Sequence, residues 1–261
     1  MITSSDAIAR RFADLRATSK RALVPYITAG HPDEERTIEL LNALGESGAD
    51  VIELGLPFSD PMADGPIIQA SSQRALELGM HFDRMLDLVA RARARVPLVL
   101  FSYLNPILSA GPDALSRASE AGFSGLLLTD LPVGADPELE MRLGQGPLAF
   151  IRLVAPTTPQ ARMREIAAHG SGFVYLISRT GVTGLREDLP PELPDTVARL
   201  RSATTLPVCV GFGVSRPEHA AAVARIADGV VVGSAMVRAA GEGVGQAAAL
   251  TASLRAAIDA A

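Results

Sequence analysis

The sequence has few of the residues that build disulfides and metal sites. Its 261 residues include one cysteine, Cys209, which lies in the apolar run LPVCV. A single cysteine excludes a disulfide framework and a cysteine-based metal cage, and it fits a reducing compartment. We interpret Cys209 as a small buried apolar residue. The four histidines lack the spacing of metal ligands, so we expect no metal site.

Lysine, net positive charge and long apolar stretches are also scarce. Lys20 is the only lysine, and 24 basic against 29 acidic side chains give a formal net charge of −5. This sign disfavours nucleic acids and anionic membranes as partners, and we expect neither. No window approaches the roughly 18 apolar residues of a membrane helix, and residues 1–20 lack the apolar region of a signal peptide. We therefore expect a soluble, cytoplasmic protein.

Short apolar runs alternate regularly with stretches of helical periodicity. Most runs are apolar on both faces, as in strands buried in a parallel sheet. The predicted strands are Ala22–Thr28, Val51–Leu54, Leu98–Phe101, Gly125–Thr129, Ala149–Val154, Phe173–Ile177, Val208–Val210 and Gly229–Val232. Apolar stripes between the strands predict helices such as Glu34–Ser47, Met85–Arg95, Asp113–Ala121, Gln160–Ala168 and Glu218–Ala224.

Eight strand-helix units in about 250 residues favour a closed parallel (β/α)8 barrel, a TIM barrel, with an open doubly wound sheet as the alternative. No linker divides the chain, so we expect residues 1–261 to form one catalytic domain. Before the first strand, Ile8, Phe12 and Leu15 follow a helical spacing. They predict an extra N-terminal helix that covers the barrel floor.

The active site of such a barrel lies at the carboxyl ends of the strands. Glu53 stands there, near the end of the second predicted strand and on the same side as Val51. A carboxyl group among apolar neighbours has a raised pKa, which suits a general acid. A solvated glutamate at a strand end is the alternative. Asp64 follows in a loop rich in proline and glycine, where it could be catalytic or could cap the next helix.

Several motifs resemble those of one enzyme family. The run ELGLPFSDPMADGP, from Glu53 to Pro66, closely resembles the signature of the tryptophan synthase alpha subunit family. The resemblance continues in order, each time at a predicted strand end, through VPYITAGHP, LLLTDLPV, YLISRTGVTG, GFGVS and VVGSAMV. It implies a TIM-barrel lyase that cleaves indole-3-glycerol phosphate to indole and glyceraldehyde 3-phosphate in the last steps of tryptophan biosynthesis.

The resemblance also implies a partner. In the family, indole passes to a separate beta subunit that holds pyridoxal phosphate, within an α2β2 heterotetramer. We therefore expect a beta subunit as partner and no cofactor in this chain. By resemblance, partner contacts lie at Pro57, Asn105 and Pro132. The segment Gly134–Gly146 departs from the family, which more often has an acidic, clearly helical stretch there.

The resemblance identifies Glu53 and Asp64 as catalytic and Tyr175 as the active-site tyrosine. The residues agree with this by elimination, because retro-aldol cleavage usually needs a lysine Schiff base or a divalent metal. Lys20 precedes the first strand, on the wrong face of the barrel. Carboxyl groups suffice if the indole ring takes up the electrons after protonation at C3. We expect Glu53 to transfer that proton and Asp64 to accept a hydrogen bond from the ring N–H.

Further residues are expected to bind the substrate. Backbone N–H groups of the loops after the seventh and eighth strands commonly bind phosphate in this fold. The long loop from Ser178 to Pro190 is interpreted as a hinged lid, in which Arg179 anchors the loop or faces the phosphate. The expected substrate-binding residues are Tyr26, Phe101, Leu127, Thr183, Gly184, Gly211, Phe212, Gly213, Gly233 and Ser234.

Two other functions stay open from the sequence. The first is a stand-alone lyase that releases indole freely. The second is a non-catalytic activator of a beta subunit, which would have no chemical need for Glu53, Asp64 and the phosphate-site glycines. Measuring the release of indole by the isolated chain, with and without a beta subunit, separates these functions.

Overall fold

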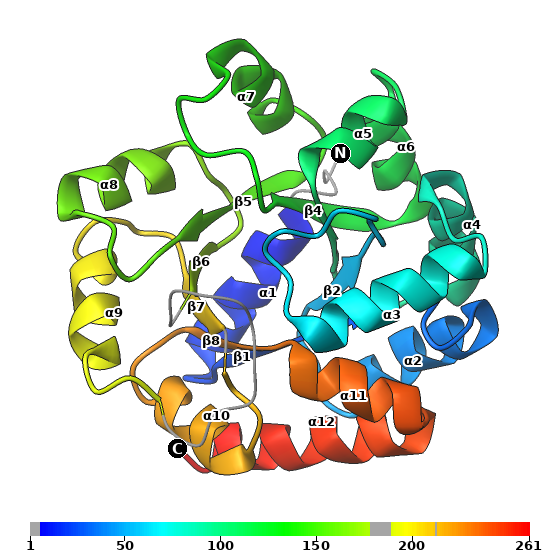
Figure 1. The fold of residues 1–261 in the computed structure, drawn as a ribbon. Helices are drawn as coiled ribbons and strands as arrows, with labels where there is room; N and C mark the ends of the chain where they lie inside the picture. Colours follow the sequence, from blue (N-terminus) through cyan, green and yellow to red (C-terminus); the bar gives the residue numbers. More distant parts are fainter. Residues whose placement is uncertain (1–5, 178–188, 212) are drawn as a thin grey trace.

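The strands form a closed barrel. The computed structural model describes residues 6–177, 189–211 and 213–261. Within this part of the chain, parallel strands pair in sequence order from β1 to β8, and β8 pairs with β1 to close the ring. Helices surround the barrel (Figure 1). The predicted (β/α)8 barrel is confirmed, and the open doubly wound sheet is excluded.

The elements have the following bounds. The strands are β1 (Ala22–Thr28), β2 (Ile52–Gly55), β3 (Leu98–Ser102), β4 (Phe123–Leu128), β5 (Ala149–Val154), β6 (Val174–Ile177), β7 (Val208–Gly211) and β8 (Gly229–Val232). The helices are α1 (Asp6–Ala17), α2 (Glu34–Glu46), α3 (Pro66–Glu77), α4 (Phe82–Ala92), α5 (Leu104–Ser109), α6 (Ala114–Ala121), α7 (Pro137–Gly144), α8 (Gln160–Ala168), α9 (Leu193–Arg201), α10 (Pro217–Ala224), α11 (Ser234–Glu242) and α12 (Val244–Asp259).

Both faces of the strands are buried, which explains their uninterrupted apolar runs. On β3, for example, Val99 packs inside the barrel, and its neighbours Leu98 and Leu100 pack under the helices. Successive strand residues point to opposite faces, so each strand supplies both layers. The position of a side chain within this alternation therefore decides whether it can reach the barrel interior.

Helix α1 closes the floor of the barrel, as predicted. Its residues Ile8, Phe12 and Leu15 are buried in the same apolar cluster as the inward-facing strand residues. The rings of Phe12 and Phe173, the residue just before β6, have centroids 5.6 Å apart. Figure 1 shows α1 lying across one end of the ring of strands. The opposite end, at the carboxyl ends of the strands, is the one that remains for a site.

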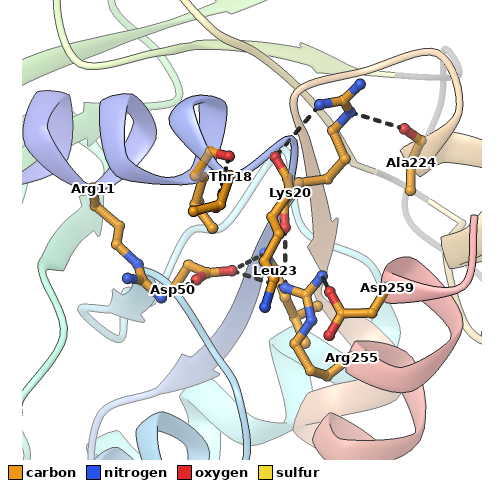
Figure 2. Close-up of polar contacts among 10 residues, drawn as sticks. Arg11, Thr18, Lys20, Leu23, Asp50, Ala224, Arg255 and Asp259 are labelled. Atoms are coloured by element: carbon orange, nitrogen blue, oxygen red, sulfur yellow. Dashed lines mark hydrogen bonds and ion pairs between the residues drawn. The ribbon is translucent and has the colours of Figure 1, made fainter.

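A buried carboxylate connects the elements that form this floor. Asp50, just before β2, is 2% exposed. It accepts hydrogen bonds from the backbone N–H of Leu23 at 2.7 Å, from Arg255 of α12 at 3.0 Å and from Arg11 of α1 (Figure 2). Arg255 packs over Gly48, where an added methyl group would lie 2.6 Å from Cγ of the arginine. We call Arg11, Asp50 and Arg255 the floor clamp.

The segment Gly134–Gly146 contains a helix despite its glycines and proline. Asp136 caps α7 by accepting a hydrogen bond from the backbone N–H of Leu139 at 3.0 Å. Glu140 of α7 forms a buried ion pair of 2.7 Å with Arg152 of β5. The segment is therefore anchored to the barrel. No helix of the described part of the chain is long and apolar enough to span a membrane.

Candidate active site

Glu53 lies near the carboxyl end of β2, and its side chain points into the barrel. It shares this inward face with Val51, and its partners in the neighbouring strands are Tyr26 of β1 and Val99 of β3. The residue is 1% exposed. Its carboxyl oxygen Oε1 is buried without a hydrogen-bond partner among the described residues. The alternative of a solvated glutamate is therefore wrong.

Burial keeps the carboxyl group of Glu53 protonated, which is the state that a general acid needs. Removal from water raises the pKa of its carboxyl group to about 8, because a charge is disfavoured in an apolar surrounding. Glu53 therefore holds its proton at neutral pH. Its charged form would also act on the hydroxyl groups of Tyr26 and Tyr175, whose pKa values it helps to raise. Glu53 and the two tyrosines thus form one group inside the barrel.

Asp64 lies in the loop between β2 and α3 and is 7% exposed. Burial raises the pKa of its carboxyl group to about 6, and a hydrogen bond from the side chain of Tyr103 opposes this rise. Asp64 is therefore mostly ionised at pH 7, whereas Glu53 is protonated. The N-cap of α3 is Gly65, so the alternative that Asp64 caps this helix is wrong.

The predicted residues Tyr26 and Tyr175 lie at the same end of the barrel. The charge of Asp64 contributes to the raised pKa of Tyr26, and the charge of Glu53 contributes to that of both tyrosines. Each hydroxyl lies against a glycine of the neighbouring strand. A methyl group added at Gly55 would lie 2.1 Å from the hydroxyl oxygen of Tyr26, and one added at Gly211 would lie 2.1 Å from that of Tyr175.

These close approaches give Gly211 a role that the sequence reasoning missed. Gly211 was expected to bind phosphate, but here the absence of its side chain leaves room for the ring of Tyr175. No local pattern could reveal this role, because the two residues belong to different strands and meet only through the strand register, in which Cys209 pairs with Tyr175.

Apolar side chains border the two carboxyl groups. The rings of Tyr26 and Phe101 meet edge to face, with centroids 5.1 Å apart. Leu127 is fully buried in the inner cluster, and Phe101 is half-buried beside it. Ile68 and Val237, which the sequence analysis did not single out, pack against Tyr26. An aromatic ring system fits such a lining, whereas a polar ligand would lose its hydrogen bonds to water there.

The ends of β7 and β8 offer space for an anion. Gly213 has φ +99°, and a methyl group added there would meet nothing within 4 Å. Gly233 is the N-cap of α11, so no side chain caps the backbone N–H groups of the first turn, which starts at Ser234. Such N–H groups and the positive end of the helix dipole are suited to bind phosphate.

Some predicted residues lie outside the described residues, namely Arg179, Thr183, Gly184 and Phe212, together with positions 178–188 of the predicted lid. The others are described above, except Lys20. Lys20 lies between α1 and β1, at the floor end of the barrel (Figure 2), whereas Glu53 lies near the carboxyl end of β2. No group of three or more potential metal ligands occurs within the described ranges.

Comparison with known proteins gives consistent results. The family model for the tryptophan synthase alpha chain matches residues 12–259. A protein from Desulfatibacillum aliphaticivorans named tryptophan synthase alpha chain is 50% identical over 234 residues, covering 88% of each chain. A protein of the same name from Geobacter sulfurreducens (strain ATCC 51573 / DSM 12127 / PCA) is 50% identical over 234 residues, covering 88% of this chain and 89% of that one.

Solved structures agree as well. A chain of Mycobacterium tuberculosis tryptophan synthase superimposes with a TM-score of 0.89 at 36% identity, covering 96% of this chain and 97% of that one. The tryptophan synthase subunit alpha from Legionella pneumophila str. Paris gives a TM-score of 0.89 at 38% identity and covers all of both chains.

Proposed function

The chain belongs to the tryptophan synthase alpha chain family, and from this membership we propose how its residues carry out the reaction. It is an alpha-type lyase of tryptophan biosynthesis that cleaves indole-3-glycerol phosphate to indole and glyceraldehyde 3-phosphate. The observation that carries the proposed mechanism is the pairing of a buried, protonated Glu53 with a largely ionised Asp64 at the carboxyl end of the barrel.

Glu53 begins the reaction by giving its proton to C3 of the indole ring. The ring nitrogen shares its lone pair and becomes an iminium, which is the electron sink that a lysine or a metal supplies in other retro-aldol enzymes. The resulting carboxylate of Glu53 then takes the proton of the adjacent glycerol hydroxyl. The bond between C3 and the glycerol carbon breaks, its electron pair returns to the ring, and an aldehyde forms. Glu53 ends the cycle protonated, as it began.

Asp64 stabilises the positive charge that develops on the ring. Its carboxylate accepts a hydrogen bond from the ring N–H, and this interaction strengthens as the nitrogen becomes positive. Tyr26, Phe101 and Leu127 form the slot for the indole ring, and Tyr175 packs beside Glu53. Thr183 of the lid is assigned to contact Asp64 when the lid closes.

The substrate phosphate binds at the ends of β7 and β8. We assign it to the backbone N–H groups of Gly213, Gly233 and Ser234, with Gly184 and Phe212 as neighbours. Gly211 serves this site indirectly, by leaving room for Tyr175. A phosphate held at one end and an indole ring held in the slot would place the glycerol carbons against Glu53.

The product indole passes to a beta subunit that holds pyridoxal phosphate, within an α2β2 assembly, and this chain works without a cofactor of its own. Large apolar side chains at the site end support a docking face, since Met62 is 82% exposed and Leu108 is 52% exposed. Of the three residues that are expected to contact the partner, Asn105 and Pro132 are also exposed, whereas Pro57 is buried. Residues 1–261 act as one catalytic domain. The cytoplasmic location stays a prediction.

The test of this function is the Glu53→Gln variant. Its amide cannot supply the proton, so turnover of indole-3-glycerol phosphate should fall by about 10²–10⁴, the usual share of a general acid–base group. Binding of glycerol phosphate should stay unchanged. Turnover within a few-fold of the parent chain would show that another residue transfers the proton.

The partner is tested separately. Steady-state indole release is measured for the chain alone and with a beta subunit. A higher rate in the presence of the beta subunit supports the assembly. Equal rates, together with separate elution of the two chains, identify a stand-alone lyase, and no release under either condition identifies a non-catalytic activator.

A further inference from the structure

Tyr103 lies directly beside the proposed active site, although the sequence analysis did not single it out. It follows β3 and is the N-cap residue of α5. It is buried, and its ring packs against that of Phe58 in the loop after β2, with centroids 5.1 Å apart. The backbone N–H of the next residue, Leu104, donates to Asp130 Oδ1 at 2.7 Å. The position of the Tyr103 ring is therefore fixed from two sides.

The hydroxyl group of Tyr103 binds the loop that carries Asp64. It accepts a hydrogen bond of 2.9 Å from the backbone N–H of Ala63, the residue before Asp64. The same hydroxyl interacts with the carboxyl group of Asp64, and this interaction opposes the rise in the pKa of Asp64 that burial causes. The side chain of Thr129 also interacts with this hydroxyl. One hydroxyl thus fixes the backbone of the loop next to Asp64 and also interacts with the Asp64 carboxyl group.

We propose that Tyr103 is a positioning residue for Asp64, whose carboxylate it holds towards the N–H group of the indole ring. The inference rests on the proposed function, in which Asp64 accepts that hydrogen bond. Tyr103 itself does not touch the substrate. Without its hydroxyl, Asp64 could rotate away, and the backbone N–H of Ala63 would lose its acceptor.

A hydrogen bond donated to a carboxylate favours its ionised form, so this contact is measurable by titration. Burial raises the pKa of Asp64, and the Tyr103 hydroxyl limits that rise. Asp64 also interacts electrostatically with Tyr26 of β1. Burial raises the pKa of Tyr103 to about 12 and raises that of Tyr26 further, so both stay neutral while Asp64 titrates.

The experiment is the Tyr103→Phe variant, which keeps the ring and removes only the hydroxyl. The titration of the Asp64 carboxyl carbon is followed by ¹³C NMR in the intact chain, alongside the pH profile of turnover. We expect the pKa of Asp64 to rise by roughly one unit, as the loss of a hydrogen bond to a charged group implies. At pH 7, kcat should fall about tenfold or more with a smaller change in KM, and should partly recover between pH 7 and pH 8, where Asp64 ionises while Glu53 still holds its proton.

Phe58→Leu is the matched control, because it changes the packing of the Tyr103 ring but leaves the hydroxyl in place. It should leave the titration of Asp64 unchanged. An unchanged pKa of Asp64 in Tyr103→Phe, or an equal shift in Phe58→Leu, overturns the inference. The NMR titration needs no turnover, so it decides the inference even if the lyase assay contradicts the proposed function.

Discussion

Glu53 and Asp64 carry the same carboxyl group, and their surroundings give them opposite protonation states. Glu53 is enclosed by apolar side chains and has one carboxyl oxygen without a partner, so its pKa rises to about 8. Asp64 is buried less completely and receives a hydrogen bond from Tyr103, so its pKa rises only to about 6. The acid and the charge stabiliser therefore coexist near pH 7 without any metal ion in the proposed mechanism.

This arrangement of Glu53 should cost stability at alkaline pH. The folded state keeps the proton of Glu53 up to about pH 8, whereas the unfolded chain releases it near pH 4.5. The folded state thus binds more protons in this window, and the free energy of unfolding falls as the pH rises through it. Glu53→Gln removes the titration, so it should be more stable than the parent by at least about 1 kcal/mol at pH 8.

The measurement is denaturant unfolding of both chains at pH 4.5 and pH 8. The gain of Glu53→Gln over the parent should be present at pH 8 and much smaller at pH 4.5, where Glu53 is protonated in the folded parent and about half protonated in the unfolded one. A difference that does not change between the two pH values would mean that Glu53 titrates normally in the folded chain.

The glycines proposed to bind the substrate phosphate allow a second test by single substitutions. Gly213→Val places a branched side chain where the phosphate is proposed to bind, and should weaken the binding of glycerol phosphate at least about tenfold. Arg179→Met removes a positive charge and should matter less, because we assign the anion to backbone N–H groups and a helix dipole. Affinities of both variants are measured by calorimetry.

Backbone strain needs a control in this experiment, because Gly213 has φ +99°. Gly134 has φ +88° and also has open space around it, so Gly134→Val carries similar strain away from the proposed phosphate site. It should reduce stability and leave affinity unchanged. A greater loss of affinity in Arg179→Met than in Gly213→Val would identify the arginine as the main phosphate ligand.

Among the elements, three strands and the helix α8 (Gln160–Ala168) have their predicted bounds. Strands β1, β5 and β8 have the predicted bounds, because a run that is apolar on both faces coincides with the stretch of chain that is buried in the barrel. The predicted helix Met85–Arg95 instead spans Phe82–Ala92. Its apolar periodicity continues past the real end, whereas Arg93 leaves the helix with φ 51°, a local conformation that the periodicity cannot reveal.

The residues of the candidate site also show which features a sequence pattern can predict and which it cannot. Glu53 and Asp64 could be found because one lies near the end of a strand and the other in the loop that follows it. Tyr103 also follows a strand end, and this was the one available signal for it. Its contact with Ala63 and Asp64 joins loops of neighbouring strands, so it becomes visible only when the barrel closes. Gly211 was missed for the same reason, since its partner Tyr175 lies on another strand.

The contact between β6 and β7 gives a prediction at this scale. Gly211→Ala would bring a methyl group to 2.1 Å from the Tyr175 hydroxyl oxygen, so the ring or the strand must move. We expect a loss of stability of about 1–3 kcal/mol, the usual cost of overpacking, and reduced turnover. Thermal unfolding and the lyase assay check this expectation.

Gly144→Ala is the control, because a methyl group there meets nothing within 4 Å at the end of α7. It should be neutral or slightly stabilising. Combining Gly211→Ala with Tyr175→Leu should cost less stability than the sum of the two single changes, since the smaller side chain removes the clash. Additive costs would show that the two residues do not interact.

In the whole molecule, one end of the barrel carries the floor clamp and the opposite end carries the proposed active site. The floor clamp joins α1, the residue before β2 and α12 at the floor, whereas Glu53 lies near the carboxyl end of β2. Asp50→Asn should therefore destabilise the chain by about 3 kcal/mol, because two arginines lose a buried partner, while kcat stays near that of the parent. Asp83→Asn, which removes an exposed partner of Arg117, should cost less than about 1 kcal/mol. Equal destabilisation of the two variants would contradict the clamp.

The clamp also bears on how the chain is made. Asp50 and Arg255 are 205 residues apart, and at typical rates of synthesis the arginine emerges roughly 10–40 s after the aspartate. Throughout that time the first strands have apolar surfaces to bury but only Arg11 to neutralise Asp50. The growing chain therefore lacks this contact of the barrel floor until α12 has been translated. The last helix both covers the barrel and supplies the second charge at Asp50, so the final fold is reached only after nearly all of the chain has been translated.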